Sequence, residues 1–596
     1  MAELLTKTDK RSCYCAELSK ANLGQTVCVM GWAQRQRDLG QLIFIDLRDR
    51  TGIVQLAFDD ATDRAVFEKA FTVRAEFVLC AHGVVRARGE GAVNPNLPTG
   101  EIEIAVTELK ILSAAQTPPF EISDSVKVGE NIALKYRYLD LRRPSLQRNM
   151  LMRQEIARVT REYYYENGFI EIETPMMVKP TPEGARDYIV PSRIHNGSFY
   201  ALPQSPQIYK QLLMLSGFDR YIQLARCFRD EDLRADRQPE FTQIDLEMSF
   251  VTEDDVMEMN EGYVARLFKE VLGVEIALPL PRLTFRDAME RYGSDKPDTR
   301  FGMEIQNISD LVENSGFAVF SGAVKDGGSV RAIVVKDGAA KLTRKEIDKL
   351  TEHARGIGAK GLAYVRWVDE TPACSFAKFM AEGELETILA RLDCKKGDVA
   401  LIVADKDKVT LPVLGALRLK VGKQLDLIPE GYNFLWITEF PFFEWDEESQ
   451  TWAAMHHPFT MPLDECLEYI DTDPGKVRAK AYDLVLNGVE ISSGSIRITD
   501  VELQQRMFRR LGLTEEEIDR KFGFLVDAYR YGAPPHGGAA LGLDRLAMIM
   551  CGADSLRDVV AFPKVQNASE LMSGCPAPAD PKALGELGIK LAEEEK

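Results

Sequence analysis

Residues 227–241 read Cys-Phe-Arg-Asp-Glu-Asp-Leu-Arg-Ala-Asp-Arg-Gln-Pro-Glu-Phe, a concentration of arginines and acids that includes an amide and ends in an aromatic ring. The runs on either side, 221–225 and 242–247, alternate between apolar and polar residues as β-strands do. We therefore predict two antiparallel strands joined by a long charged loop. Arg229 can pair with a phosphate through its guanidinium fork, and Phe241 offers a face on which a purine can stack. The alternative is a solvated loop crossed by surface salt bridges, but the polar residues of the second strand are ones that a plain core strand avoids.

Length and composition limit the possible architectures. A chain of 596 residues exceeds one hydrophobic core and predicts three to five domains. The net charge of −18 argues against non-specific nucleic-acid binding by the whole surface, although a local basic face is compatible with it. Apolar runs stay short of the ~20 residues of a membrane span, and residues 1–7 lack the apolar core of a signal peptide, so we expect a cytoplasmic protein without membrane contact. The ten cysteines contain no Cys-x-x-Cys pair and predict structural thiols without a function.

The first 112 residues have the pattern of a small all-β domain, an OB-type barrel of five strands with one intervening helix. The expected strands are 27–32, 41–47, 52–58, 76–86 and 101–112, with the helix near 61–71. The face expected to be open carries Arg35, Arg37, Phe44, Arg48, Gln55, Arg86 and Arg88. Cations with one aromatic ring suit the stacking and hydrogen bonding of unpaired bases. An equally good alternative is a solvated basic patch with Phe44 in the core.

The remaining chain divides by composition. A helix over about 145–167 leads into a strand over 169–175, and because Pro175 confines that strand to a sheet edge, both suit a subunit contact. Residues 295–425 resemble a separately folded α/β insertion with a βαβ-like unit, in which a helix begins at Thr343. The predicted segments are 1–112 (OB domain), 113–135 (hinge), 136–294 (first part of a divided domain), 295–425 (insertion), 426–564 (second part of the divided domain) and 565–596 (C-terminal extension).

Three separated segments resemble the signature motifs of class II aminoacyl-tRNA synthetases. The helix and strand ending at Pro175 resemble motif 1, Phe228 to Glu231 resembles the Phe-Arg-x-Glu of motif 2, and Gly538 to Arg545 resembles the glycine-rich motif 3. Motif 3 departs from the pattern, since Ala540 replaces its middle glycine and Asp544 its glutamate, but a small residue and a carboxylate are kept. The order and spacing of the three segments are more specific than any one of them.

Within that class the chain resembles the bacterial aspartyl-tRNA synthetases over essentially its whole length. The resemblance is carried by residues 181–188, 204–211 and 455–459, by the insertion, and by an N-terminal OB domain followed by a hinge. It implies an antiparallel-sheet catalytic domain. It also implies a reaction in which L-aspartate and ATP form aspartyl-adenylate and pyrophosphate, after which aspartate passes to the 3′ end of tRNA(Asp). Such chemistry needs charge neutralisation and in-line positioning more than a tuned base.

The resemblance also implies the residues of the ATP site. Arg229 grips the α-phosphate and the attacking carboxylate and is the catalytic residue. Glu231 and Gln238 hold the adenosine, while Phe241 and Arg545 sandwich the adenine. Further positions implied at this site are Asp230, Glu490, Gly542, Leu543 and Asp544.

For aspartate, the resemblance implies that Lys210 and Arg497 clamp the side-chain carboxylate. Two buried cations reject asparagine, because a neutral amide cannot compensate them. Gln207 and Asp245 are implied to bind the ammonium group of the substrate. The remaining implied contacts are Arg229, His456 and Glu183, the last on a loop that closes over the amino acid. An isolated histidine is usually structural, but the His-His-Pro-Phe context of His456 favours contact with substrate.

Two further groups of residues follow from the same resemblance. Asp483 and Glu490 are implied to hold Mg²⁺, with surface acids flanking an Asn-Gly turn as the alternative. The anticodon is implied to lie on the OB face, where Phe44 stacks on the middle base. The neighbouring bases are contacted by Arg37, Gln55, Arg86 and Glu103.

Several alternatives remain open from the sequence. An asparaginyl- or lysyl-type enzyme is disfavoured by Lys210 with Arg497 and by the insertion. A non-catalytic paralogue that binds tRNA or amino acid is disfavoured by retention of the ATP and metal residues. Charging of tRNA(Asn) as well as tRNA(Asp) is open, because Leu39 leans towards the strict form whereas residues 89–92 lack the lysine that often accompanies it. A homodimer is expected.

Overall fold

The computed structural model describes residues 2–180, 184–231, 237–447 and 450–592. The chain forms two compact units. The first comprises residues 1–154, 233–238 and 551–578, and the second comprises 155–232, 239–550 and 579–596. Over the described ranges, no helix has both the length and the apolar character needed to cross a membrane.

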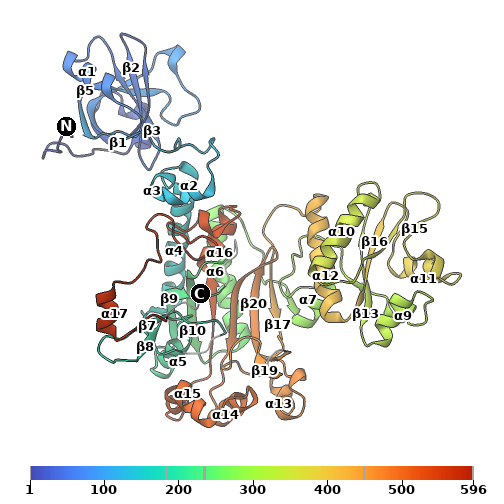
Figure 1. Ribbon diagram of the computed structural model, residues 1–596. Helices are drawn as coiled ribbons and strands as arrows, with labels where there is room; N and C mark the ends of the chain where they lie inside the picture. The colour runs from blue at the N-terminus through green and yellow to red at the C-terminus, as the bar shows by residue number, and fades with distance from the viewer. Residues whose placement is uncertain (1, 181–183, 232–236, 448–449, 593–596) are drawn as a thin grey trace. The chain divides into compact units, whose positions relative to one another are not determined.

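The N-terminal part of the first unit is a closed barrel with strand order β1-β2-β3-β5-β4, which confirms the OB-type prediction (Figure 1). Alternate residues of each strand point inward, so that side chains such as Val29, Ile45, Leu56 and Ile104 make one core. The elements are β1 Thr26–Asp38, β2 Ile43–Arg48, β3 Ile53–Phe58, α1 Arg64–Thr72, β4 Val78–Ala87 and β5 Ile102–Ser113.

Short helices follow the barrel in the same unit: α2 Glu130–Lys135, α3 Arg137–Asp140 and the start of α4 Pro144–Glu166. Arg137 ties them to the segment 551–578. Its buried guanidinium donates to the carbonyl oxygens of Arg557, Val560 and Ala561 at 2.5–2.9 Å and pairs with Asp140 at 2.8 Å. A buried cation is tolerated in the interior when each of its nitrogen atoms donates to an oxygen, as here.

The second unit is built on an eight-stranded sheet with strand order β11-β17-β20-β21-β22-β10-β9-β6. It is antiparallel except at its two outermost pairs, β11/β17 and β6/β9. The strands are β6 Ile170–Glu171, β9 Arg220–Phe228, β10 Glu240–Ser249, β11 Arg282–Thr284, β17 Phe434–Thr438, β20 Ala481–Leu486, β21 Val489–Ile496 and β22 His536–Gly542. This is the class of sheet that the motif pattern predicts.

The strand expected over 169–175 is shorter than the alternation predicts. Only Ile170 and Glu171 pair within β6, and Thr174 bonds to Gln223 through its hydroxyl rather than its backbone. Pro175 cannot donate to a ladder, so pairing stops before it. The prediction that this strand lies at a sheet edge is confirmed.

Helices flank this sheet, and two small hairpins extend from it (Figure 1). The helices of this unit include α5 Gln207–Leu215, α6 Glu253–Leu272, α7 Phe285–Tyr292, α13 Tyr469–Thr472, α14 Val501–Arg510, α15 Glu515–Tyr529, α16 Leu543–Met550 and α17 Pro581–Leu587, the last of which lies apart from the sheet. The hairpins are β7 Ile189–Pro191 with β8 Phe199–Ala201 and β18 Phe443–Asp446 with β19 Thr451–Ala454.

The insertion has its own five-stranded sheet with order β12-β13-β16-β14-β15. Successive residues of β13 enter two different cores, since Ile333 and Val335 pack with one set of side chains and Ala332 and Val334 with another. The expected βαβ unit is present but split, because β16 lies between β13 and β14 and is antiparallel to both. The elements are β12 Gln306–Asn307, α8 Ser309–Val312, α9 Ala318–Lys325, β13 Ser329–Val335, α10 Arg344–Ile357, β14 Ala363–Arg366, β15 Ala373–Cys374, α11 Glu384–Arg391, β16 Val399–Asp405 and α12 Asp407–Gln424.

Candidate functional site

The pairing of β10 with β22 sets out the candidate amino-acid site. Asp245 lies opposite Ala540 and Glu247 opposite Gly538, and the two acids share one face because side chains alternate along a strand. A Cβ at position 538 would lie 2.1 Å from both Glu247 Oε2 and Leu246 O. Glycine at this position therefore makes room for the Glu247 carboxylate over the neighbouring strand.

Two cations and two acids form a buried charge cluster on this face. Lys210 Nζ on α5 lies 2.6 Å from Asp245 Oδ1 and 3.4 Å from Glu247 Oε2. Arg497, directly after β21, donates from Nε and Nη2 to the two oxygens of Glu247 at 2.9 and 3.0 Å. All four residues are at most 3% exposed. The cluster brings together Lys210, Arg497 and Asp245, which the resemblance assigns to the aspartate site, around Glu247, an acid without an expected role.

The equal numbers of positive and negative side chains explain why this cluster is tolerated in the protein interior. Isolated buried ions are strongly unfavourable, whereas two cations interleaved with two anions cancel. Burial raises the pKa of Asp245, although Lys210 opposes the shift. Burial also raises the pKa of Glu247, but the positive charges of Arg497 and Lys210 outweigh this effect, so the pKa of Glu247 lies below its usual value. Glu247 is thus the fixed counter-charge of the cluster.

His457 is a second partner that the sequence analysis missed. Arg497 Nη1 lies 2.7 Å from His457 Nε2 and 2.5 Å from Ser495 Oγ. Because arginine only donates, Nε2 accepts this hydrogen bond, while Nδ1 lies 3.3 Å from both Phe459 N and Thr460 Oγ1. Desolvation and the charge of Arg497 lower the pKa of His457 well below its ordinary value, consistent with a neutral ring. The His-His-Pro-Phe string was the available signal, but it directed attention to His456.

Two buried polar atoms beside the cluster, Gln207 Nε2 and Asp245 Oδ2, have no hydrogen-bond partner among the described residues. Gln207 lies one turn before Lys210 on α5, so its side chain projects from the same side of the helix. An unsatisfied buried polar group costs roughly 1–3 kcal/mol. These atoms are suited to a ligand that carries both donors and acceptors.

At the end of β9, Arg229 lies over Phe241, with its guanidinium carbon 5.3 Å from the ring centroid. The two strands meet here, since Arg229 N donates to Pro239 O at 2.9 Å. Within the described ranges Arg229 Nε is buried without a hydrogen-bond partner. Asp230 forms a bridge with Arg186, and Glu231 follows it as the last described residue before the gap at 232–236. The expected antiparallel strands are present, whereas the predicted contact at Glu183 lies outside the described residues.

The motif 3 segment forms the end of β22 and the start of α16. Gly542 ends the strand and Leu543, which is buried, begins the helix. Asp544 Oδ2 accepts from the backbone N–H of Thr242 at 3.0 Å, so its carboxylate fastens the helix to β10. Arg545 Nη1 donates to the carbonyl oxygen of Glu490 at 3.0 Å. The sheet thus positions both groups of residues predicted for the ATP site: Arg229 and Phe241 at β9 and β10, and Asp544 and Arg545 after β22.

Gln238 belongs to the first unit. There its side-chain amide accepts from Lys564 N at 2.8 Å and donates to Lys564 O at 3.1 Å. Its predicted contact with the adenosine stays a prediction.

Asp483 and Glu490 come from β20 and β21, which are joined by an Asn-Gly turn whose two residues have positive φ. Asp483 is buried, which is against its being a surface acid, and its Oδ1 lacks a hydrogen-bond partner among the described residues. Burial raises the pKa of Glu490, and the charge of Asp483 adds to the shift. His456 Nε2 lies 3.8 Å from Asp483 Oδ1 rather than in the Arg497 cluster. Although burial alone would lower the pKa of His456, Asp483 and Glu490 raise it.

The barrel brings all five predicted anticodon residues together. Arg37 donates to Gln55 Oε1 at 2.8 Å, Gln55 Nε2 donates to Glu103 at 2.7 Å, and Arg86 Nε donates to the same carboxylate at 2.7 Å. The Arg37 guanidinium lies 5.6 Å from the ring centroid of Phe44. Phe44 is partly exposed and outside the barrel core, so the alternative that buries it is wrong.

Two other members of the predicted basic face are differently placed. Arg88 is buried and donates to the carbonyl oxygen of Ile102 at 2.8 Å. Arg48 is buried and paired with Glu76 at 2.8 Å, which also binds Arg142 at 2.8 Å. Because its guanidinium is buried against Glu76, Arg48 is not available to a base on the barrel surface.

Known proteins resemble the chain over nearly its whole length. Residues 129–566 match the family described as tRNA synthetases class II (D, K and N), and residues 27–112 match the OB-fold nucleic acid binding domain. A protein of Ruminiclostridium cellulolyticum named aspartate--tRNA ligase is 59% identical over 98% of this chain and 99% of its own. One of Caldanaerobacter subterraneus subsp. tengcongensis, named aspartate--tRNA(Asp/Asn) ligase, is 57% identical over 98% of each.

Among solved structures, the asparaginyl-tRNA synthetase of Pyrococcus horikoshii, complexed with asparaginyl-adenylate, has a TM-score of 0.58 at 18% sequence identity. The match covers 92% of this chain and 97% of that one. At that identity the likeness concerns the fold. The family match covers the sheet, the charge cluster and the segments around Arg229 and Arg545, and the barrel matches separately. The chain belongs to the class II tRNA synthetases of the D, K and N group.

Proposed function

We propose that the chain is an aspartate–tRNA ligase. In the first step, the α-carboxylate of L-aspartate attacks the α-phosphate of ATP, pyrophosphate leaves, and aspartyl-adenylate forms. In the second, a hydroxyl of the terminal ribose of tRNA(Asp) attacks the aspartyl carbonyl and AMP leaves. The observation that carries the proposal is the buried cluster in which Asp245 and Glu247 hold Lys210 and Arg497 beside unsatisfied polar atoms. The names of relatives up to 59% identical support the same activity.

The donors of the cluster fit the aspartate side chain. Arginine has five N–H donors and lysine three. In the described part of the chain, hydrogen bonds from Arg497 to Glu247, His457 and Ser495 use four donors, and the bond from Lys210 to Asp245 uses one. Each cation therefore retains donors for a carboxylate. Asparagine would present its NH₂ group to these donors, an arrangement that leaves them unpaired and is strongly disfavoured.

The substrate ammonium has acceptors beside the same cations. Asp245 Oδ2 is buried without a partner among described residues, and Gln207 offers its side-chain amide from α5. An ammonium needs acceptors rather than donors, which suits the carboxylate of Asp245 and the carbonyl oxygen of Gln207. Partnering Asp245 with an ammonium would remove part of the cost of burying its charge. His456 and Glu183 are assigned to the substrate on the family resemblance alone.

For ATP we assign Arg229 to the α-phosphate and the attacking carboxylate. Its buried Nε awaits an acceptor, and neutralising charge that develops on the phosphate is the main task in such a transfer. Phe241 and Arg545 are the proposed faces for the adenine. Positioning by these groups, without a tuned base, is what the mechanism requires.

A hard divalent cation fits Asp483 and Glu490. Asp483 Oδ1 is buried without a hydrogen-bond partner within the described residues, with His456 Nε2 3.8 Å away, and Glu490 carries a raised pKa from burial beside a second acid. Two carboxylates of this kind are the oxygen ligands that Mg²⁺ prefers next to phosphates. Bound there, the ion would neutralise phosphate charge. The two carboxylates would hold it, and their mutual repulsion would fall.

For tRNA we propose that the anticodon binds the barrel face around Phe44. The partly exposed ring offers a stacking surface, while Gln55 and Glu103 offer a donor and an acceptor that can read base edges. Arg37 and Arg86 are already neutralised by acids at 2.9 and 2.7 Å, so we expect only a modest salt dependence from them. A homodimer through the β6 edge and a cytoplasmic location belong to the same proposal.

Two assays test the function. Exchange of labelled pyrophosphate into ATP, dependent on L-aspartate, is expected, and its absence from folded protein would leave only a binding role. Charging of purified tRNA(Asp) and tRNA(Asn) with labelled aspartate then separates a strict from a dual enzyme, since relatives carry both names. A tRNA(Asp) that remains uncharged beside active exchange would contradict the second step.

A further inference from the structure

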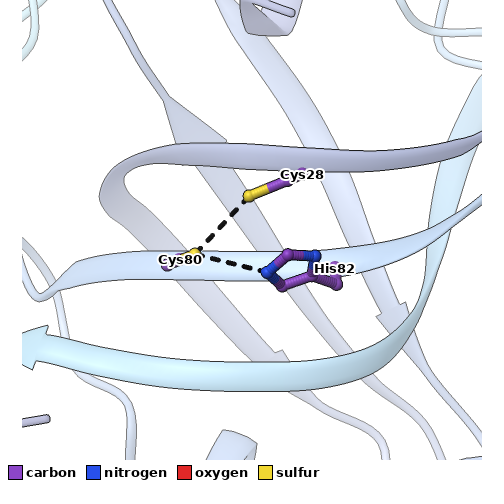
Figure 2. Close-up of side chains that lie close together, drawn as sticks. All are labelled: Cys28, Cys80 and His82. Atoms are coloured by element: carbon purple, nitrogen blue, oxygen red, sulfur yellow. Dashed lines mark hydrogen bonds between the residues drawn. The ribbon is translucent and has the colours of Figure 1, made fainter. Parts of the chain in front are cut away.

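A cluster of two thiols and an imidazole lies on the outer side of the barrel. Cys28 on β1 pairs across the ladder with His82 on β4, and Cys80 is two residues before His82 (Figure 2). The neighbours Val29 and Ala81 fill the barrel core, so the alternating residues 28, 80 and 82 point to the opposite side. Figure 2 shows the three side chains gathered on one side of the two strands.

The N-terminal segment covers this side of the barrel. Ser12 and Cys28 exchange hydrogen bonds, with Ser12 N donating to Cys28 O and Cys28 N donating to Ser12 Oγ, both at 2.9 Å. Asp9 Oδ1 lies 3.0 Å from His82 Nε2. This cover leaves Cys80 fully buried and Cys28 5% exposed, while the His82 side chain keeps 21% of its surface. The cluster is therefore enclosed, with access from solvent at the histidine.

The distances match those between ligands of one tetrahedral metal ion. Zinc–sulfur bonds of about 2.3 Å and zinc–nitrogen bonds of about 2.05 Å put two thiolates about 3.8 Å apart and a thiolate and an imidazole about 3.6 Å apart. In this chain Cys28 Sγ lies 3.6 Å from Cys80 Sγ, and Cys80 Sγ lies 3.9 Å from His82 Nε2. All three ligand atoms lie within 4.8 Å of one another.

We propose that Cys28, Cys80 and His82 bind a zinc-like divalent cation that fastens the N-terminal segment to the outside of the barrel. Binding replaces two S–H protons by the ion, so two protons leave to solvent for each metal bound. The Asp9 carboxylate stands beside the fourth coordination position. Two sulfur ligands and one nitrogen select zinc over magnesium or calcium, which require oxygen.

The charges around the site also favour a divalent ion. Two thiolates and the Asp9 carboxylate carry three negative charges, which the ion and the Lys110 ammonium balance. Lys110 Nζ lies 2.8 Å from Asp9 Oδ2, and the same oxygen accepts from the hydroxyl of Thr6 at 2.7 Å. These contacts hold Asp9 in place from outside the ligand group, as supporting residues do in metal sites. Because the segment carrying Asp9 precedes β1, metal binding joins parts of the barrel that are distant in sequence.

Metal titration of the full-length, reduced protein tests the proposal. With Co²⁺ as a probe, we expect a thiolate-to-cobalt charge-transfer band and the visible bands of a tetrahedral site, saturating at one equivalent and bleached by Zn²⁺. Cys28→Ser and Cys80→Ser should abolish the charge-transfer band or reduce it by half. Cys13→Ser is the matched control, because Cys13 is on the same segment but packs against the barrel core.

Thermal unfolding gives a second readout. Zn²⁺ should raise the midpoint for the wild type and Cys13→Ser and leave it unchanged for Cys28→Ser. Retention of one tight equivalent in a Cys28→Ser/Cys80→Ser double variant would overturn the assignment. So would an intact mass two daltons low in protein purified without reductant, if peptide mapping places a Cys28–Cys80 disulfide there. None of these readouts depends on the synthetase reaction.

Discussion

Substitution of Arg497 distinguishes the contribution of the charge cluster to protein stability from its contribution to aspartate binding. Arg497→Met removes four hydrogen bonds and leaves Glu247, which is fully buried, with Lys210 at 3.4 Å as its cationic partner among the described residues. Breaking a buried pair from one side costs about 3–5 kcal/mol of stability. Truncating a buried charge that binds a ligand charge costs about 2–5 kcal/mol, so kcat/KM for aspartate should fall about 30- to 5,000-fold.

The double variant Arg497→Met/Glu247→Gln restores neutrality, since Lys210 and Asp245 remain as a balanced pair. We expect its thermal midpoint to recover most of the loss seen in the single variant, while pyrophosphate exchange with aspartate stays low. The KM for ATP should change little in either variant. Arg509→Met, at an exposed ion pair with Glu515, is the control and should change activity less than about twofold. Recovery of aspartate activation together with stability would refute a direct role of Arg497 in binding the substrate.

Three further predictions concern separate parts of the chain. Gly538→Ala puts a Cβ 2.1 Å from Glu247 Oε2 and from backbone, so the thermal midpoint should fall by the equivalent of about 1–3 kcal/mol or more, and an unchanged midpoint would refute the close approach. Phe44→Ala should raise the KM for tRNA about 5- to 150-fold, the value of one stacked base, without changing pyrophosphate exchange, and an equal loss in both assays would count against an anticodon role. His536→Asn tests pH dependence: burial lowers the pKa of His536, so the unfolded state takes up a proton first and stability falls as pH drops below about 6.5. Asparagine can keep the donor to Pro534 O at 2.8 Å, and urea midpoints from pH 7 to 5 should decline less steeply in this variant; parallel curves would show that His536 does not titrate in this way.

The sequence was most informative where structure follows from local pattern. Alternation over 221–225 and 242–247 predicted β9 and β10, because one face of each strand meets the core. The same reasoning located all five barrel strands. The Asn487-Gly488 turn between β20 and β21 has the positive φ angles that such a pair favours.

Local sequence patterns could not predict which strands and side chains pair when they are distant in the sequence. The bonds between Glu247 and Arg497 join residues 250 apart, and nothing in the alternation of β10 indicates that its neighbour is β22. The resemblance to a known family implied the role of Arg497 in binding aspartate, whereas its partners Glu247 and His457 became evident only from the structure. In the insertion, β16 enters between the two strands of the expected βαβ unit, a choice of partner that local periodicity does not encode.

The spacing of the cysteines did not reveal the cluster of Cys28, Cys80 and His82 for a related reason. Cys28 and Cys80 are 52 residues apart and match no short metal-binding motif, so the sequence predicted inert thiols. The antiparallel ladder between β1 and β4 places their sulfur atoms together, and the N-terminal segment encloses them.

The most direct test of the central claim is pyrophosphate exchange measured with aspartate and asparagine on the same preparation. A site that offers buried donors from Lys210 and Arg497 to a carboxylate predicts a ratio of kcat/KM of about 10⁴ or more in favour of aspartate. A ratio near one, or a preference for asparagine, would contradict the assignment of this charge cluster to the side chain of aspartate.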